Sequence, residues 1–183
     1  MTGTGFTVEF AAPEPQRLAH WWAHVLRWTV GPDDVVRPTG PGVELRFAAS
    51  EADKAGKNAV HLELRSESYE HQRDTLLRLF NAGARFTDEG EDVPWQEMTD
   101  PAGNELRLLE PRQSDVDTGP VASVVVGSSD PSADSARWVS AGLQVVRRDP
   151  ALIALHSTAR TGPYLEFKLG GPTTGMLRVL PEL

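Results

Sequence analysis

The pattern of hydrophobic and polar residues at the start of the chain predicts a strand, a helix and then further strands. Residues 6–10 alternate between apolar and polar like a half-buried strand, and two prolines follow that run. Apolar residues then recur at helical spacing across 16–26. The stretches 28–36 and 43–48 have the composition of short strands separated by a turn rich in glycine and proline. We interpret residues 5–50 as a βαβββ module.

The same order of elements begins again after a charged connector. Residues 60–65 alternate as a strand, and residues 69–82 predict an amphipathic helix. The apolar side chains expected on the buried side of this helix are Leu76, Leu77 and Phe80. The turn sequence Asp-Pro-Ala-Gly-Asn then precedes a strand over 105–109. Residues 57–111 therefore predict a second βαβββ module.

A third module follows in pattern, with a strand, a helix over about 133–141 and further strands. The class is α+β, and a repeat of this length without a solenoid motif indicates duplicated modules. We expect a domain of two modules over 1–111, a polar linker over 112–120 and a third, unpaired module over 121–183. An unpaired sheet edge exposes backbone donors and acceptors, so this arrangement predicts a homodimer formed through the third module.

Composition narrows the classes of partner and chemistry. The net charge is −8 and the pI is about 5.1, so the surface repels a phosphate backbone and no nucleic acid is expected as a partner. The chain shows no long apolar run and no signal-peptide pattern, which predicts a cytoplasmic protein without membrane association. Because there is no cysteine, any chemistry must come from His, Glu, Asp, Arg or Tyr.

Three segments carry a family resemblance: Leu-Ala-His-Trp-Trp-Ala-His-Val-Leu at 18–26, Gly-Lys-Asn-Ala-Val-His-Leu-Glu-Leu at 56–64, and Asp-Pro-Ala-Gly-Asn-Glu at 100–105. With them the sequence resembles the glyoxalase-like, bleomycin-resistance type of the vicinal oxygen chelate (VOC) superfamily. The resemblance extends over about residues 5–111 and covers the third module only in pattern. It implies paired βαβββ modules that form a curved mixed sheet, with helices on the outer face and a ligand cavity inside.

The resemblance also implies where a divalent metal ion would bind, because metal-dependent members use residues from the first and last strands of paired modules. The first-strand positions match Thr7 and His61. The last-strand position of the second module matches Arg107, a guanidinium that cannot ligate a cation. Two residues on one face compete for the position in the first module, namely Glu44 and Arg46. We therefore expect no metal cofactor; if a divalent metal ion binds, His61 and Glu44 are its ligands.

The third module offers Glu166 at the corresponding last-strand position. Its first-strand counterpart is Ser123, and no complete fourth module is recognisable to finish such a site. The predicted ligand site therefore excludes the third module.

Strand alternation separates the polar residues of each strand from the leucines that meet the helices. The polar residues expected to line the cavity and bind a ligand are Glu9, Glu44, Arg46, His61, Glu63 and Arg107. Trp95 is expected near the cavity mouth, where its ring could contact the ligand. His61 is a candidate general base. The competing interpretation is that these charges pair with one another and only satisfy a narrow cleft.

Three functions are compatible with the sequence. The first is a metal-free protein that binds a small organic compound, as an antibiotic-sequestering protein does. The second is a metal-dependent glyoxalase-type lyase, isomerase or dioxygenase. The third is a non-catalytic scaffold or regulatory protein whose cavity is filled by its own side chains.

Overall fold

The computed structural model describes residues 3–87 and 93–182. Three α-helices and thirteen strands lie in these ranges. The helices are α1 (Pro15–Leu26), α2 (Tyr69–Asn81) and α3 (Pro131–Ser140), with a short 3₁₀ helix η1 (Gln113–Asp115). The strands are β1 (Phe6–Ala12), β2 (Thr29–Val30), β3 (Val36–Arg37), β4 (Leu45–Ala49), β5 (Val60–Leu64), β6 (Arg85–Phe86), β7 (Gln96–Thr99), β8 (Glu105–Leu108), β9 (Val121–Ser128), β10 (Gln144–Asp149), β11 (Leu152–His156), β12 (Tyr164–Leu169) and β13 (Leu177–Pro181).

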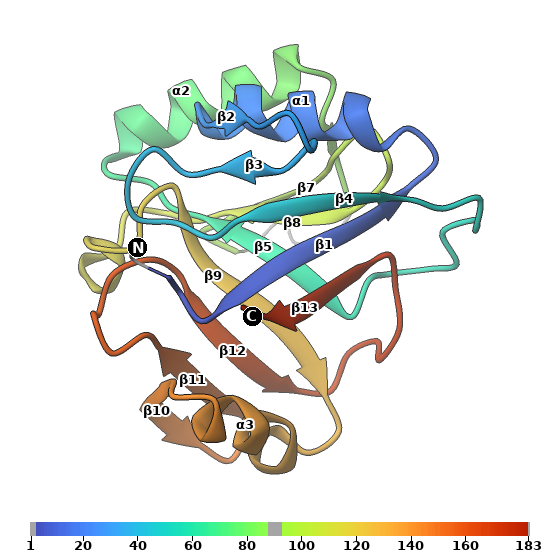
Figure 1. Cartoon of the computed structure of the whole chain (residues 1–183). Helices are drawn as coiled ribbons and strands as arrows, with labels where there is room; N and C mark the ends of the chain where they lie inside the picture. The colour runs from blue at the N-terminus through green and yellow to red at the C-terminus, as the bar shows by residue number, and fades with distance from the viewer. Residues whose placement is uncertain (1–2, 88–92, 183) are drawn as a thin grey trace.

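The strands form two mixed sheets, which confirms the predicted α+β class and the repeated βαβββ modules (Figure 1). The five-stranded sheet has the order β13-β1-β4-β3-β2, and the eight-stranded sheet has the order β10-β11-β12-β9-β5-β8-β7-β6. Within each module the first strand lies parallel to the last, as in β1 with β4, β5 with β8, and β9 with β12. The three modules therefore share one internal topology.

The third module is not unpaired, and this part of the predicted architecture is wrong. Strand β9 pairs antiparallel with β5, so the second and third modules together build the eight-stranded sheet. In this register Val125 lies opposite His61, and Ser123 lies opposite Glu63. The pairing satisfies the backbone groups of the β9 edge within the chain. It removes the structural reason for expecting a homodimer through the third module, and that dimer stays a prediction.

The first module has a partner strand of the same kind. Strand β13 pairs antiparallel with β1, placing Arg178 opposite Glu9. Relative to the first module, β13 thus occupies the place that β9 occupies relative to the second. The predicted final strand over 176–180 forms β13.

The helices pack where their apolar faces predict. Pro15 stands in the first turn of α1, and Arg27 ends that helix in the left-handed conformation. Trp22 of α1 is fully buried and its ring lies 5.4 Å from that of Phe10. At the opposite end of Figure 1, α3 packs on β11 and β12, and its Trp138 meets Phe6 of β1 edge-on at 6.2 Å. The third module is therefore tied to the first through its helix.

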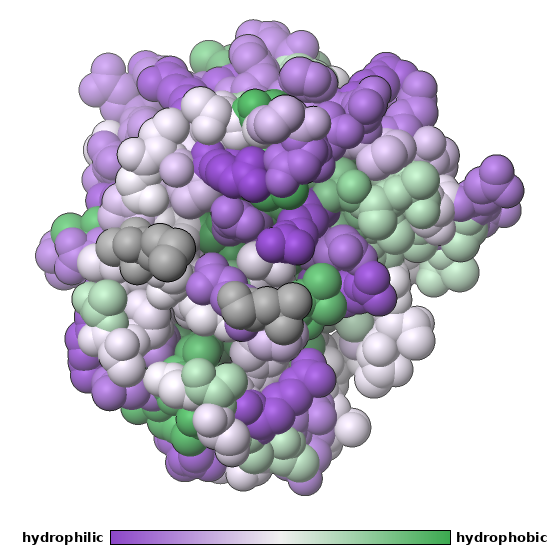
Figure 2. Space-filling model, viewed as in Figure 1, coloured by the Kyte–Doolittle hydropathy of each residue, from purple (hydrophilic) through white to green (hydrophobic). Residues whose placement is uncertain are grey.

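The buried face of α2 differs from the prediction. Its buried residues are Thr75 and Leu79, whereas Leu77 and Phe80 are 54% and 58% exposed. The sequence Leu-Leu-Arg-Leu-Phe places apolar residues in two neighbouring rows of the helix, and periodicity alone does not say which row meets the sheet. Figure 2 shows that hydrophilic side chains predominate over the helical layer.

Within the described ranges no helix combines the length and apolar character needed to cross a membrane.

Replacing Trp138 tests how strongly α3 holds the modules together. Trp138→Ala removes a side chain that is 2% exposed, and we expect the free energy of unfolding to fall by about 3–5 kcal/mol. The neighbouring Val139 is 42% exposed, so Val139→Ala should cost about 0.5 kcal/mol or less. Urea denaturation followed by tryptophan fluorescence and circular dichroism measures both. Equal losses in the two variants would contradict the packing described here.

Candidate functional site

Two neighbouring cavities open along one face of the eight-stranded sheet. The larger has a volume of about 530 Å³ and is lined by residues of β5, β9, β10, β11 and β12 and of the segment 109–118. The second, of about 300 Å³, is lined by residues that include His61, Arg107 and Lys168. His61 and Glu63 lie two residues apart on one face of β5, and one lines each cavity. The two cavities therefore share one wall.

The carboxylate of Glu63 has three polar neighbours on this face. It accepts a hydrogen bond of 2.9 Å from the Ser123 hydroxyl, and the Arg107 Nη1 lies 3.6 Å from its Oε1. The His61 Nε2 lies 3.7 Å from the same oxygen. Burial raises the pKa of Glu63. His61, Ser123 and Arg107 together lower this pKa by more than burial raises it, so the net shift is downward. Glu63 is thus an anion at neutral pH.

Arg107 is held by two carboxylates and an aromatic ring. Its Nε donates to Glu97 Oε2 at 3.0 Å, and Glu97 is only 7% exposed. The guanidinium carbon also lies 5.5 Å from the centre of the Trp95 ring. Glu97, Arg107 and Glu63 lie side by side on β7, β8 and β5, because cross-strand partners share a face. In this row, the positive charge of Arg107 lies between two negative carboxylates of the second module.

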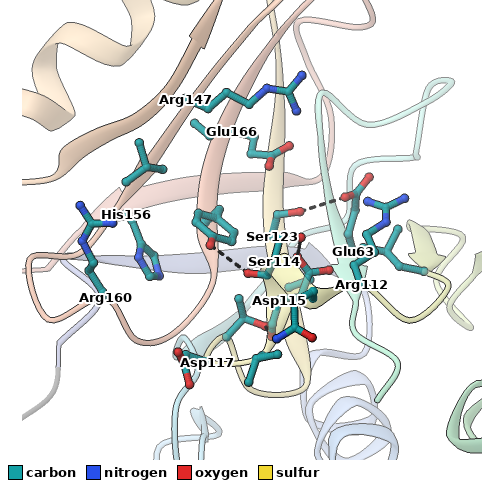
Figure 3. A pocket seen from close by; sticks show the side chains of 18 residues that line it. Glu63, Arg112, Ser114, Asp115, Asp117, Ser123, Arg147, His156, Arg160 and Glu166 are labelled. Carbon is teal, nitrogen blue, oxygen red and sulfur yellow. Dashed lines mark hydrogen bonds between the residues drawn. The ribbon is translucent and has the colours of Figure 1, made fainter. Parts of the chain in front are cut away.

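Glu166 is the carboxyl group that these ion pairs leave out. It stands on β12 opposite Val125, which in turn lies opposite His61. Among the described residues, no hydrogen bond or ion pair holds its carboxylate. Burial and the nearby charge of Glu63 raise the pKa of Glu166 to about 7, against a weaker opposing effect of Arg147. Figure 3 shows Glu166 and Glu63 reaching into the same cavity from either side of Ser123.

The predicted ligand-binding residues do not all lie on this face. His61, Glu63 and Arg107 come together as expected, and Trp95 lies beside Arg107. The other predicted residues belong to the first module and to the five-stranded sheet; they are Glu9, Glu44 and Arg46.

Local ion pairs hold these first-module residues. The Arg178 Nε donates to the Glu9 carboxylate at 2.7 Å. Glu44 is paired with Arg37 at 3.3 Å and with Arg46 at 3.7 Å. On this sheet, these charged side chains therefore pair with one another, as the competing interpretation of the sequence predicts.

The structure changes which residues stand at the family's metal-ligand positions. Because the second module pairs with the third, these positions are His61, Arg107, Ser123 and Glu166 on four neighbouring strands. A guanidinium paired with two carboxylates and a serine that donates to Glu63 do not suit a divalent cation. Across the described residues, no group of three or more His, Asp or Glu side chains could hold a metal ion. This donor set does not fit the family's metal.

The sequence predicts Glu166 and Ser123 at strand positions of the third module, outside the predicted ligand site. The alternation in 164–169 was a usable signal for the face on which Glu166 lies. The missing step was the identity of the partner module, which no local pattern supplies.

The raised pKa of Glu166 predicts a pH dependence of stability. In the unfolded chain this carboxyl ionises near its ordinary pKa of 4.5, and in the folded protein near 7. The folded state therefore binds more protons between these values, and stability falls as pH rises through this window. Glu166→Gln should be more stable relative to the wild type at pH 8 than at pH 5, by on the order of 2–3 kcal/mol.

Chemical denaturation at both pH values measures this difference. Glu70→Gln, which changes an exposed carboxyl in the first turn of α2 and leaves Glu166 in place, is the control, and its pH profile should run parallel to that of the wild type. Parallel pH profiles for the wild type and Glu166→Gln would contradict the assignment.

Comparisons with known proteins agree with this fold. The family model for the glyoxalase-like domain matches residues 7–109. A glyoxalase I variant from Zea mays superimposes with a TM-score of 0.67 at 12% identity, over 97% of this chain and 71% of that one. A candidate dioxygenase from Bacillus subtilis superimposes with a TM-score of 0.59 at 17% identity, over 97% of this chain.

This chain spans 65% of the length of the Bacillus subtilis protein. No curated protein sequence matches this chain. The structural neighbours are too distant in sequence to indicate more than the fold. The family match, however, covers more than half of the chain and includes β5, β8 and the helices between the strands. The chain therefore belongs to the glyoxalase-like domain family of the VOC superfamily.

Proposed function

We propose that this protein binds a small organic molecule in the two neighbouring cavities of its eight-stranded sheet, without a divalent metal ion. The observation that carries the proposal is the position of Arg107. A guanidinium stands where the family uses a metal-binding carboxylate, and it is paired with Glu63 and Glu97. A metal ion placed there would have to displace a fixed positive charge from two carboxylates.

The carboxyl group that the protein's own ion pairs leave available indicates which chemical group the ligand carries. Glu63 and Glu97 are already engaged by Arg107, whereas Glu166 has a carboxyl group open to the cavity. A cationic amine or another strong hydrogen-bond donor on the ligand would compensate its buried charge. The cavity volume of about 530 Å³ lies in the range of drug-sized ligand sites. Sequestration of such a compound, including an antibiotic, is the simplest use of this site.

A second candidate function is proton transfer on a bound substrate. It is favoured by one specific observation, namely that Glu63 and Glu166 share a cavity while their pKa values are shifted in opposite directions. Such a pair separates a carboxylate from a carboxylic acid at neutral pH. His61 remains a candidate base, because its Nε2 is buried and has no hydrogen-bond partner among the described residues. Turnover of a bound compound, rather than binding alone, distinguishes this function from sequestration.

Metal content and ligand binding test the proposal together. Protein purified without a metal-affinity tag should contain no stoichiometric divalent metal by elemental analysis. Added zinc, manganese or nickel should leave the melting temperature unchanged, because the donor set does not suit them. One equivalent of metal retained through dialysis would overturn the metal-free proposal.

A thermal-shift screen of organic amines should identify ligands that stabilise the protein. For such a ligand, Glu166→Gln should weaken binding about 10- to 100-fold, the size expected for the loss of a charge-assisted hydrogen bond. Calorimetry measures the dissociation constants, and Glu70→Gln serves as the matched control with unchanged affinity. Equal affinity in the wild type and Glu166→Gln would show that the ligand does not use this carboxyl.

A further inference from the structure

A third cavity, of about 130 Å³, lies in the helical layer and shares no lining residue with the two described above. Its walls come from the end of α1, the end of β5, the α2 helix and the loop at Gly119 and Pro120. The charged side chains that line it are mostly cations: Arg27, Arg65 and Arg78, with His71 and Glu67 beside them.

The arginines of this cavity are incompletely paired. The Nε atoms of Arg65 and Arg78 are buried and have no hydrogen-bond partner among the described residues. Each of these two arginines makes one polar side-chain contact at its terminal nitrogens. Arg78 Nη2 donates to Thr75 at 3.1 Å, and Arg65 Nη1 lies 3.6 Å from Glu67. Glu67 is 65% exposed, so solvent screens its charge. A buried donor without a partner is costly and calls for a ligand or water.

The electrostatics of the cavity favour an anion. Burial lowers the pKa of Arg78, and so does the charge of Arg27 facing it, against a smaller opposing effect of Asp74. Asp74 itself lies 3.7 Å from Arg73. The carboxyl end of α1 contributes a partial negative charge of about half an elementary unit, less than the charge of one guanidinium. The positive charges therefore exceed the negative charges available to neutralise them.

His71 adds a hydrogen-bond donor, and its hydrogen bond to the backbone defines the tautomer of its ring. The backbone N–H of Glu67 donates to His71 Nδ1 at 3.2 Å, so the proton of the neutral ring is on Nε2. Donors therefore come from α2 and from the segment after β5, around one small space.

We propose that this cavity is an oxyanion site that takes one phosphate group, held by Arg27, Arg65 and Arg78. Guanidinium forks match phosphate oxygens, and a tetrahedral dianion can accept from several donors at once. The volume of about 130 Å³ accommodates a phosphate group with a few waters, at about 30 Å³ for each water, but not a nucleoside. The source is either free inorganic phosphate or the terminal phosphate of a small monoester.

Calorimetric titration with inorganic phosphate and with glycerol phosphate, in chloride buffer of matched ionic strength, tests the site. Binding by the wild type should be weakened about tenfold or more in Arg27→Gln and in Arg78→Gln. Arg17→Gln removes the same charge from an α1 side chain that is 75% exposed, and it should bind like the wild type. Binding of both compounds assigns the site to phosphate monoesters, and binding of inorganic phosphate alone assigns it to the free ion.

Thermal unfolding provides a second readout. Phosphate at a hundredfold excess over Kd should raise the Tm of the wild type by roughly 5 °C, and chloride should not. Arg27 is exposed, so Arg27→Gln is expected to fold even if the half-buried Arg78 cannot be replaced. No binding of either compound at millimolar concentration, or the same Kd in Arg27→Gln as in the wild type, would overturn the proposal.

Discussion

The antiparallel pairing of β5 with β9 is the interaction on which the rest of the site depends. It joins the second and third modules into one sheet and sets His61 opposite Val125 and Glu63 opposite Ser123. The parallel pairs on either side then place Arg107 next to Glu63, and Glu166 next to Val125. A shift of one residue in this register would turn these side chains to the other face. The cavity is thus a direct consequence of one strand pairing.

The charges on this face are arranged in two unequal halves. On the second module, Arg107 between Glu63 and Glu97, together with Lys57 3.6 Å from Glu97, pairs both carboxylates within the protein. On the third module, the partly buried Glu166 has no such partner among the described residues, and its pKa rises to about 7. The first half is therefore complete as it stands, while the second half gains from a ligand that brings a positive charge or a proton donor.

The helical layer shows the opposite imbalance. There, guanidinium groups gather around a small cavity with few carboxylates to meet them. The net charge of −8 gives no hint of this, because it sums over the whole surface. Local charge depends on which side chains the fold brings together. Arg27 follows α1, Arg65 follows β5, and Arg78 lies in α2.

The sequence by itself determined the order of the elements and much of the polar set. Hydrophobic period is a local property, so the βαβββ repeats and the shared face of His61 and Glu63 could be predicted from it. The family resemblance came from three short segments of the sequence.

Only the tertiary structure decided which modules share a sheet. Strand edges pair through backbone groups that are the same in every residue, so the sequence pattern did not say that β9 joins β5 and that β13 joins β1. For the same reason Glu9, Glu44 and Arg46 stand on a different sheet from His61, while Glu166 joins it. Strands that are far apart in the sequence pair with one another, and packing rather than local pattern determines which strands pair.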